Sequence, residues 1–184
     1  MNSEEQTPSI AVVYESMFGS TRRIAEAIAD GIRPHRSVAV VPVSGAAELP
    51  RELEALIVGG PTHAHGMSRP ESRAEAVAWA ANDQKHLRLD AEGSSSGVRE
   101  WIAGGPPQAR RFAAFDTRVD MPRIFTGSAA AAIDKRLAKT RSSRLSDPMS
   151  FLVDRTSALQ AGEIERARAW GDVLGAELRI NVVG

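Results

Sequence analysis

Short apolar runs alternate along the chain with longer segments in which apolar residues recur every three or four positions. Runs rich in β-branched and other apolar residues predict five strands, at 9–14, 37–43, 53–60, 110–119 and 149–158. Helical spacing predicts helices at 21–32, 71–82, 127–140 and 162–178, with a shorter helical turn at 97–102. Because strand and helix alternate, the economical arrangement is a parallel sheet with right-handed crossovers and helices on both faces.

Particular residues refine this outline. The first strand is almost continuously apolar, which is typical of a strand covered on both faces. Pro42 cannot donate to a ladder on both sides, so the second strand is predicted at the sheet edge. Ser68 and Glu71 stand in capping-box register with Pro70 in the first turn, which predicts where the second helix begins. The last helix is expected to gather its apolar residues on one side: Ile164, Ala167, Trp170, Val173, Leu174 and Leu178.

Length and charge limit the possible functions. A chain of 184 residues suits one domain, expected at 9–184 after a flexible, acidic leader at 1–8. The leader does not resemble an export signal, and no apolar run approaches the roughly 20 residues of a membrane span, so a cytoplasmic location is expected. The 23 basic and 23 acidic side chains cancel, so nucleic acid is not an expected partner. The absence of cysteine excludes thiolate nucleophiles and thiolate-held metals.

The link between the first strand and the first helix carries the clearest chemistry. In an open parallel sheet, ligands bind beyond the carboxyl ends of the strands, where the strand order reverses. Here Ser16, Ser20 and Thr21 supply hydroxyls, Gly19 permits close backbone approach, and the following helix offers free amides. The segment therefore predicts a cradle for a phosphate monoester. It lacks the P-loop lysine and the three-glycine fingerprint, so neither ATP nor NAD is favoured. The alternative is that Ser20 or Thr21 only caps the helix.

Several segments resemble the flavodoxins. "SMFGST" at 16–21 is similar to their phosphate loop, "VGGPTHAHGM" at 58–67 to their second flavin loop, and "AFDTR" at 114–118 to their third. "REW" at 99–101 and "EIERARAWG" at 163–171 resemble text found in flavodoxin-domain proteins. The resemblance extends from Ile10 to about Leu178 and is to the short-chain type.

The resemblance implies a three-layer α/β/α sandwich with a five-stranded parallel sheet in the order 2-1-3-4-5, which binds FMN without a covalent bond. The implied phosphate contacts are Ser16, Met17, Phe18, Gly19, Ser20 and Thr21. The implied contacts to the isoalloxazine ring are Pro61, Thr62, His63, Ala64, His65 and Gly66, with Met67 beside them, and Asp116, Thr117 and Arg118.

The resemblance also implies electron transfer, with a redox partner protein or a small electron donor or acceptor. No catalytic side chain is required, because the cofactor carries the redox chemistry. His63 and His65 lack a carboxylate partner, so an ordinary loop is favoured over a metal site. Two alternatives stay open: an NAD(P)H-dependent reductase of a quinone or a protoporphyrinogen-type substrate, and a binding module without flavin, which the absence of an aromatic residue from the third loop favours.

Charge and aromatic residues add three expectations. The neutral chain, with Arg118 near the predicted ring, predicts a less reducing flavin than in an acidic flavodoxin, unless Arg118 pairs with Asp116 or Asp120. The tryptophans at 79, 101 and 170 are expected in the core. The basic run at 134–144 is expected to be a solvated helix face, with docking of an acidic partner as the alternative.

Overall fold

The computed structural model describes residues 8–63, 66–82, 87–90 and 97–180. Its strands are β1 (Ile10–Tyr14), β2 (Val38–Pro42), β3 (Glu52–His63), β4 (Gly66–Met67), β5 (Gln108–Val119), β6 (Ser143–Arg144) and β7 (Met149–Val153). Its helices are α1 (Ser20–Ile32), α2 (Pro70–Ala80), α3 (Val98–Ala103), α4 (Arg123–Thr126), α5 (Ala129–Leu137) and α6 (Glu163–Ile180), with a 3-10 helix, η1, at Val43–Glu48. Of the predicted leader, only Pro8 lies within the described residues.

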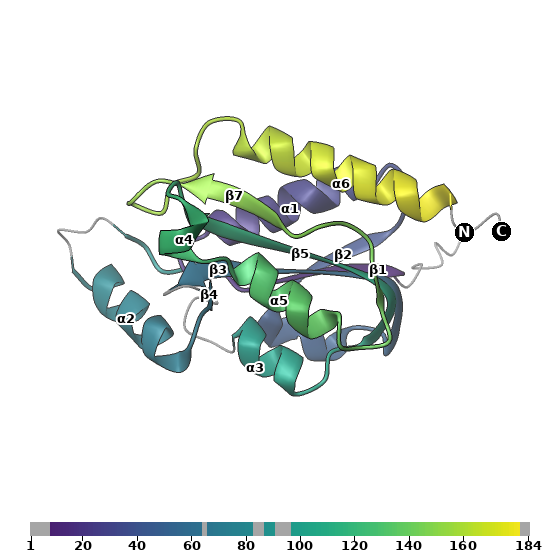
Figure 1. The fold of residues 1–184 in the computed structure, drawn as a ribbon, viewed down its shortest axis with the longest axis horizontal. Coiled ribbons are helices and arrows are strands. Elements are labelled where there is room, and N and C mark those ends of the chain that lie inside the picture. Colours follow the sequence, from purple (N-terminus) through teal and green to yellow (C-terminus); the bar gives the residue numbers. More distant parts are fainter. Residues whose placement is uncertain (1–7, 64–65, 83–86, 91–96, 181–184) are drawn as a thin grey trace, which may run out of the picture.

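The five long strands form a parallel sheet in the order β2-β1-β3-β5-β7 (Figure 1). Since β5 and β7 are the fourth and fifth long strands, this is the predicted order 2-1-3-4-5. Pro42 pairs with Tyr14 at the end of the edge strand β2, as predicted. Two strands of two residues each were not predicted: β4 pairs antiparallel with β3, and β6 pairs with the early part of β5.

Two apolar cores lie on opposite faces of the sheet. Ile10, Val12 and Tyr14 of β1 face one core, which α1 and α6 cover. Ala11 and Val13 face the other, which η1, α3 and α5 cover (Figure 1). All five residues of β1 are buried, because side chains alternate along a strand and both faces of this one are covered.

The two helices of the first core touch backbone to backbone. A Cβ atom at Gly171 of α6 would lie 2.0 Å from the carbonyl oxygen of Ile28, and one at Gly31 of α1 would lie 2.1 Å from that of Arg168. Only glycine permits this approach. The predicted apolar side of α6 is confirmed at Trp170 and its buried neighbours but is wrong at Val173, whose side chain is 59% exposed.

The start of α2 differs from the prediction. Arg69 is the residue before the helix, and its backbone N–H donates to Ser72 Oγ over 2.8 Å. Ser68, predicted to cap the helix together with Glu71, instead donates its hydroxyl to Glu15. The carboxylate of Glu15 is buried at the end of β1, and a buried carboxylate requires donors more strongly than an exposed helix end does. Among the described residues, no helix is long and apolar enough to cross a membrane.

Candidate functional site

The loop between β1 and α1 turns through a single glycine. Gly19 has φ +89°, in the left-handed region that favours glycine, and its N–H donates to Ser16 Oγ over 3.0 Å. The first turn of α1 has no side-chain cap and no acidic residue. Its end therefore keeps amide donors and a positive dipole for an anion.

Two hydroxyls bind this loop to distant parts of the chain. Thr21 Oγ1 lies 2.7 Å from Thr117 Oγ1, and both threonines are buried. Ser20 Oγ donates to the backbone oxygen of Ser157 over 2.5 Å. The two bonds bring the ends of β1, β5 and β7 together, so the predicted first and third flavin loops do meet.

A cavity of about 410 Å³ lies where these loops converge, within the size range of small-molecule sites. It is lined by Met17, Phe18, Ser20, Thr21, Pro61, Thr62, His63, Trp79, Thr117, Arg118, Val119, Met121, Thr126, Val153, Arg155 and Ser157. Three predicted segments therefore contribute to one cavity at the carboxyl ends of the strands.

Two buried polar atoms in this lining have no hydrogen-bond partner among the described residues: Nδ1 of His63 and Nε of Arg118. The His63 ring lies 5.9 Å from that of Trp79, centroid to centroid, with 32° between their planes. Arg118 Nη1 donates to the backbone oxygen of Met121 over 2.6 Å. Unpartnered buried polar atoms are uncommon in proteins, and these two belong to residues of the cavity lining.

Asp116 has a different position from its neighbour Thr117. It is fully buried, and its Oδ2 accepts hydrogen bonds from Thr62 Oγ1 (2.9 Å), Ser128 Oγ (2.7 Å) and the backbone N–H of Ala130 (2.9 Å). The carboxylate thus holds the first turn of α5 and does not line the cavity. No described ion pair joins Arg118 to Asp116 or Asp120.

The other predicted site residues fall into three groups. Ser16 and Gly19 shape the first loop without lining the cavity. Gly66 lines a separate cleft. Ala64 and His65 lie outside the described residues. Within the described part of the chain, no three histidine, aspartate or glutamate side chains gather as a metal site would require.

Sequence reasoning missed the cavity residues that come from α2 and from the segment after β5 and β7. Trp79 is half-buried and faces the cavity, so its predicted core position is wrong, whereas Trp170 is in the core as predicted. The aspartate after β7 could have predicted a turn there. Asp154 Oδ1 accepts hydrogen bonds from the N–H groups of Thr156 (2.8 Å) and Ala158 (3.0 Å), which is ordinary turn chemistry for aspartate and brings Ser157 back toward α1. The Thr156 hydroxyl also donates to Asp154 Oδ1, over 2.7 Å, and this bond lowers the pKa of Asp154 most, with the backbone N–H groups lowering it further.

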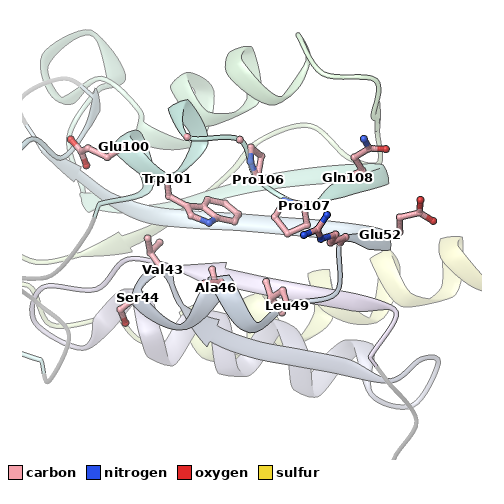
Figure 2. Close-up of a pocket in the computed structure, with 14 residues that line it drawn as sticks. Val43, Ser44, Ala46, Leu49, Glu52, Glu100, Trp101, Pro106, Pro107 and Gln108 are labelled. Carbon is pink, nitrogen blue, oxygen red and sulfur yellow. The ribbon is translucent and has the colours of Figure 1, made fainter.

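A larger cavity of about 790 Å³ lies on the η1 side of the sheet (Figure 2). Its walls are mainly apolar, with Trp101 between η1 and the segment at Pro106 and Pro107. It extends toward Glu52 and Gln108, the first residues of β3 and β5, and so away from the loop between β1 and α1. None of the unpartnered buried atoms found in the described residues lines it. The cavity near Thr21 is therefore the stronger candidate site.

No protein-family model matches the sequence, and no curated protein matches it. Solved structures do match its fold. The chain superposes on a flavodoxin from the domain Archaea with TM-score 0.60 and 21% identity, covering 92% of this chain and 98% of that one. The chain has the flavodoxin-like fold.

Two other structures carry the same likeness. Oxidised flavodoxin 2 from Bacillus cereus matches with TM-score 0.61 and 14% identity, covering 92% of this chain and 99% of that one. Rubredoxin oxygen:oxidoreductase from Desulfovibrio gigas matches with TM-score 0.61 and 17% identity over 98% of this chain but only 39% of that one. The flavodoxin-like fold thus occurs both as a whole protein and as part of a longer one.

Proposed function

We propose that this protein belongs with the flavodoxins, binds FMN without a covalent bond and acts in electron transfer, as a carrier or as a simple flavin oxidoreductase. The observation that carries the proposal is one cavity bordered by the uncapped start of α1 and by His63 and Arg118, whose Nδ1 and Nε atoms have no partner among the described residues. An anion-accepting helix end beside two unpartnered polar atoms suits a ligand with a phosphate and a polar ring. Flavodoxin neighbours at the level of fold agree with that ligand.

The residues present divide the binding task. The amides at the start of α1 would hold the phosphate, while the Ser20 hydroxyl keeps the loop against Ser157. His63 and Trp79 would form an aromatic wall for the flavin ring. They would take the place of the aromatic residue that the third loop lacks. When bound, FMN would supply the capacity to accept and donate electrons, and the protein would set its potential.

Arg118 bears on that potential. It lines the cavity and has no described carboxylate within 4.0 Å, so its positive charge acts on the ligand. At about 4 Å a unit charge contributes about 1–4 kcal/mol between bulk-water and surface-like screening, and the partial exposure of Arg118 favours the lower part of that range. Since about 1.4 kcal/mol corresponds to 59 mV for one electron, we expect the flavin potential to rise by some tens of millivolts.

FMN binding is tested with the purified protein. The preparation is examined for a flavin absorbance spectrum, and the flavin-free form is titrated into FMN while the FMN fluorescence is followed. We expect quenching at micromolar protein, and weaker binding of riboflavin, which has no phosphate. Ser20→Glu should weaken FMN binding and leave riboflavin binding nearly unchanged, because the new carboxylate repels only the phosphate.

A protein that does not quench FMN at micromolar concentration, and is colourless as purified, would overturn the proposal in favour of a flavin-free binding module. If FMN binds, steady-state assays with NADH or NADPH and a quinone separate the two forms of the proposal. Turnover of the quinone identifies a reductase, and its absence leaves a carrier.

A further inference from the structure

Five cationic side chains converge on a cleft of about 410 Å³ beside β4. They come from the residue before α2, from α3, from α5 and from the segment that follows α5: Arg69, Arg99, Lys135, Arg136 and Lys139. The rest of the described lining is Gly66, Met67 and Ala132, without a carboxylate. We call this surface the basic cleft. It is a concentrated positive field on a chain whose 23 basic and 23 acidic side chains cancel.

One cation of the basic cleft, Arg99, is held in place by backbone oxygens. Arg99 Nε donates to the backbone oxygen of Ser68 over 3.0 Å, and its Nη2 to that of Met67 over 2.8 Å. Carbonyls, not carboxylates, orient this guanidinium. No described carboxylate lies within 4.0 Å of any of the five cations.

The cost of this arrangement is visible at Arg99. Burial lowers its pKa, and the positive charges of Arg136 and Arg69 lower it further, while the negative charges of Glu100 and Glu15 offset this in part. A bound anion would relieve that repulsion. Arg144 belongs to the basic run at 134–144, as do Lys135 and Arg136. It differs from them because Asp134 neutralises it through two hydrogen bonds of 2.7 and 2.6 Å. The structure therefore separates the run at 134–144 into a paired part and an unpaired part.

The basic cleft adjoins the candidate flavin cavity. Met67 and Gly66 of β4 pair with Thr62 and His63 of β3. Thr62 and His63 line the cavity, whereas Gly66 and Met67 line the basic cleft. Directly opposed residues of antiparallel strands have Cα atoms about 4.5–5.5 Å apart. One strand spacing thus separates a residue of the cleft from a residue of the cavity.

We infer that the basic cleft docks the carboxylate-rich surface of an acidic redox partner protein beside the flavin cavity, an inference that rests on the proposed function. Cations drawn from three separate parts of the chain, with Lys135 and Lys139 exposed, suit a broad protein surface. A nucleotide would need a wall for its base, and the described lining contains no aromatic side chain.

Docking is tested first without flavin, using poly-L-glutamate as the probe and fluorescence anisotropy as the readout. The wild-type protein should bind at low ionic strength, and more weakly at 0.15 M salt because screening shortens the reach of the charges to about 8 Å. The double variant Lys135→Glu/Lys139→Glu should bind about tenfold more weakly or worse. The matched control is Arg168→Glu/Arg179→Glu, which makes the same change in net charge on α6, at exposed positions on the opposite face.

The control variant should lose no more than about threefold in affinity, as expected when only long-range charge changes. Equal losses in the two variants would overturn the inference, because net charge alone would explain the binding. The inference would equally be overturned if the wild-type protein did not bind poly-L-glutamate. It would also be overturned if inorganic tripolyphosphate bound saturably and displaced poly-L-glutamate at equal concentrations of phosphate and carboxylate groups, since the cleft would then be a small-anion site.

A second measurement tests the redox role. Electron transfer from a reduced, acidic plant-type ferredoxin to the FMN-loaded protein is followed by stopped flow. The second-order rate should fall with salt and should drop about tenfold in the cleft variant, with the control variant close to wild type. If FMN does not bind but poly-L-glutamate does, the proposed function fails and the acidic docking surface stands. If FMN binds and the ferredoxin rate is the same in both variants, the docking inference fails alone.

Discussion

Asp116→Asn distinguishes a structural role from a cofactor-binding one at the most buried carboxylate of the site. The resemblance to flavodoxins places Asp116 among the ring contacts, whereas the structure directs its Oδ2 to Thr62, Ser128 and the backbone of Ala130. If the structural reading is right, the variant loses stability, and flavin affinity of the folded protein is nearly unchanged.

The magnitude follows from the contacts. Three hydrogen bonds change from a charged to a neutral acceptor, and bonds to charged groups contribute about 1 kcal/mol more than neutral ones. A carboxylate at the start of α5 contributes a further 0.3–2 kcal/mol, roughly, through the helix dipole. The new amide donor would lie at the Oδ1 position, which is buried and has no partner among the described residues. Allowing for partial relaxation, we expect a loss of about 2–4 kcal/mol in the free energy of unfolding.

The assay is urea unfolding of the flavin-free protein, with FMN titration of each folded variant. For a chain of this length about 1 kcal/mol corresponds to 2–4 °C, so the melting temperature should fall by about 5–15 °C. Asp120→Asn is the matched control: Asp120 is exposed and accepts one bond, from Gln160 over 3.2 Å, so its loss should stay within about 0.5 kcal/mol. Unchanged stability of Asp116→Asn together with a tenfold loss of FMN affinity would refute the structural reading.

Three further substitutions test particular contacts. Gly19→Ala should cost about 1–2 kcal/mol of stability and weaken FMN binding, because the φ of +89° and not crowding excludes a side chain. Gly19→Asn should lose less stability, because asparagine tolerates this φ region better than alanine. Equal losses in the two variants would contradict strain at this φ as the cause. Gly171→Ala should destabilise the fold by about 3 kcal/mol in urea unfolding, since its Cβ would lie 2.0 Å from a backbone oxygen of α1. Gly104→Ala is the control and should be nearly neutral, because the nearest atom to its Cβ would be 3.5 Å away. Similar losses of stability in both variants would argue against close contact between α1 and α6. Glu15 has a raised pKa, chiefly because it is buried, so the folded state holds its proton more tightly than the unfolded state, and stability should fall as the pH rises from the unfolded value through the raised one. Unfolding free energies between pH 4 and 8 should show that decline in the wild type and not in Glu15→Gln; parallel curves would exclude Glu15 as its origin.

The sequence was sufficient for the sheet and the first loop because these depend on local patterns. Continuous apolarity marked β1, Pro42 marked the edge, and the glycine between hydroxyl residues marked the turn into α1. The features that it could not predict depend on distant partners. Ser68 bonds to Glu15, 53 positions away, so the local capping-box pattern was misleading.

Trp79 illustrates a second limit. The helix α2 buries only Arg73 and Ala76, so its apolar residues do not mark one core-facing side, and the spacing of those residues could not show which way the ring points. Contact with His63 decides it, and His63 is the last residue of β3, outside the helix whose pattern was read. For a helix packed at the margin of a domain, the hydrophobic pattern predicts that the helix exists but not what its large side chains touch.

Strand alternation explains why the site lies where it does. Along β5, Ala113 and Phe115 face the core beneath α1 and α6, and Thr117 is next on that side, at the level where α1 begins and the apolar core ends. Its hydroxyl can therefore meet Thr21, while Asp116 is directed to α5 on the other face. Because the side-chain period is two, a slip of β5 by one residue would bury Thr117 under α5 and turn the carboxylate toward the phosphate loop, where it would repel an anion. The register of β5 against β3, fixed by nine paired residues, is thus what keeps this carboxylate away from the end of β1, as the proposed phosphate site requires.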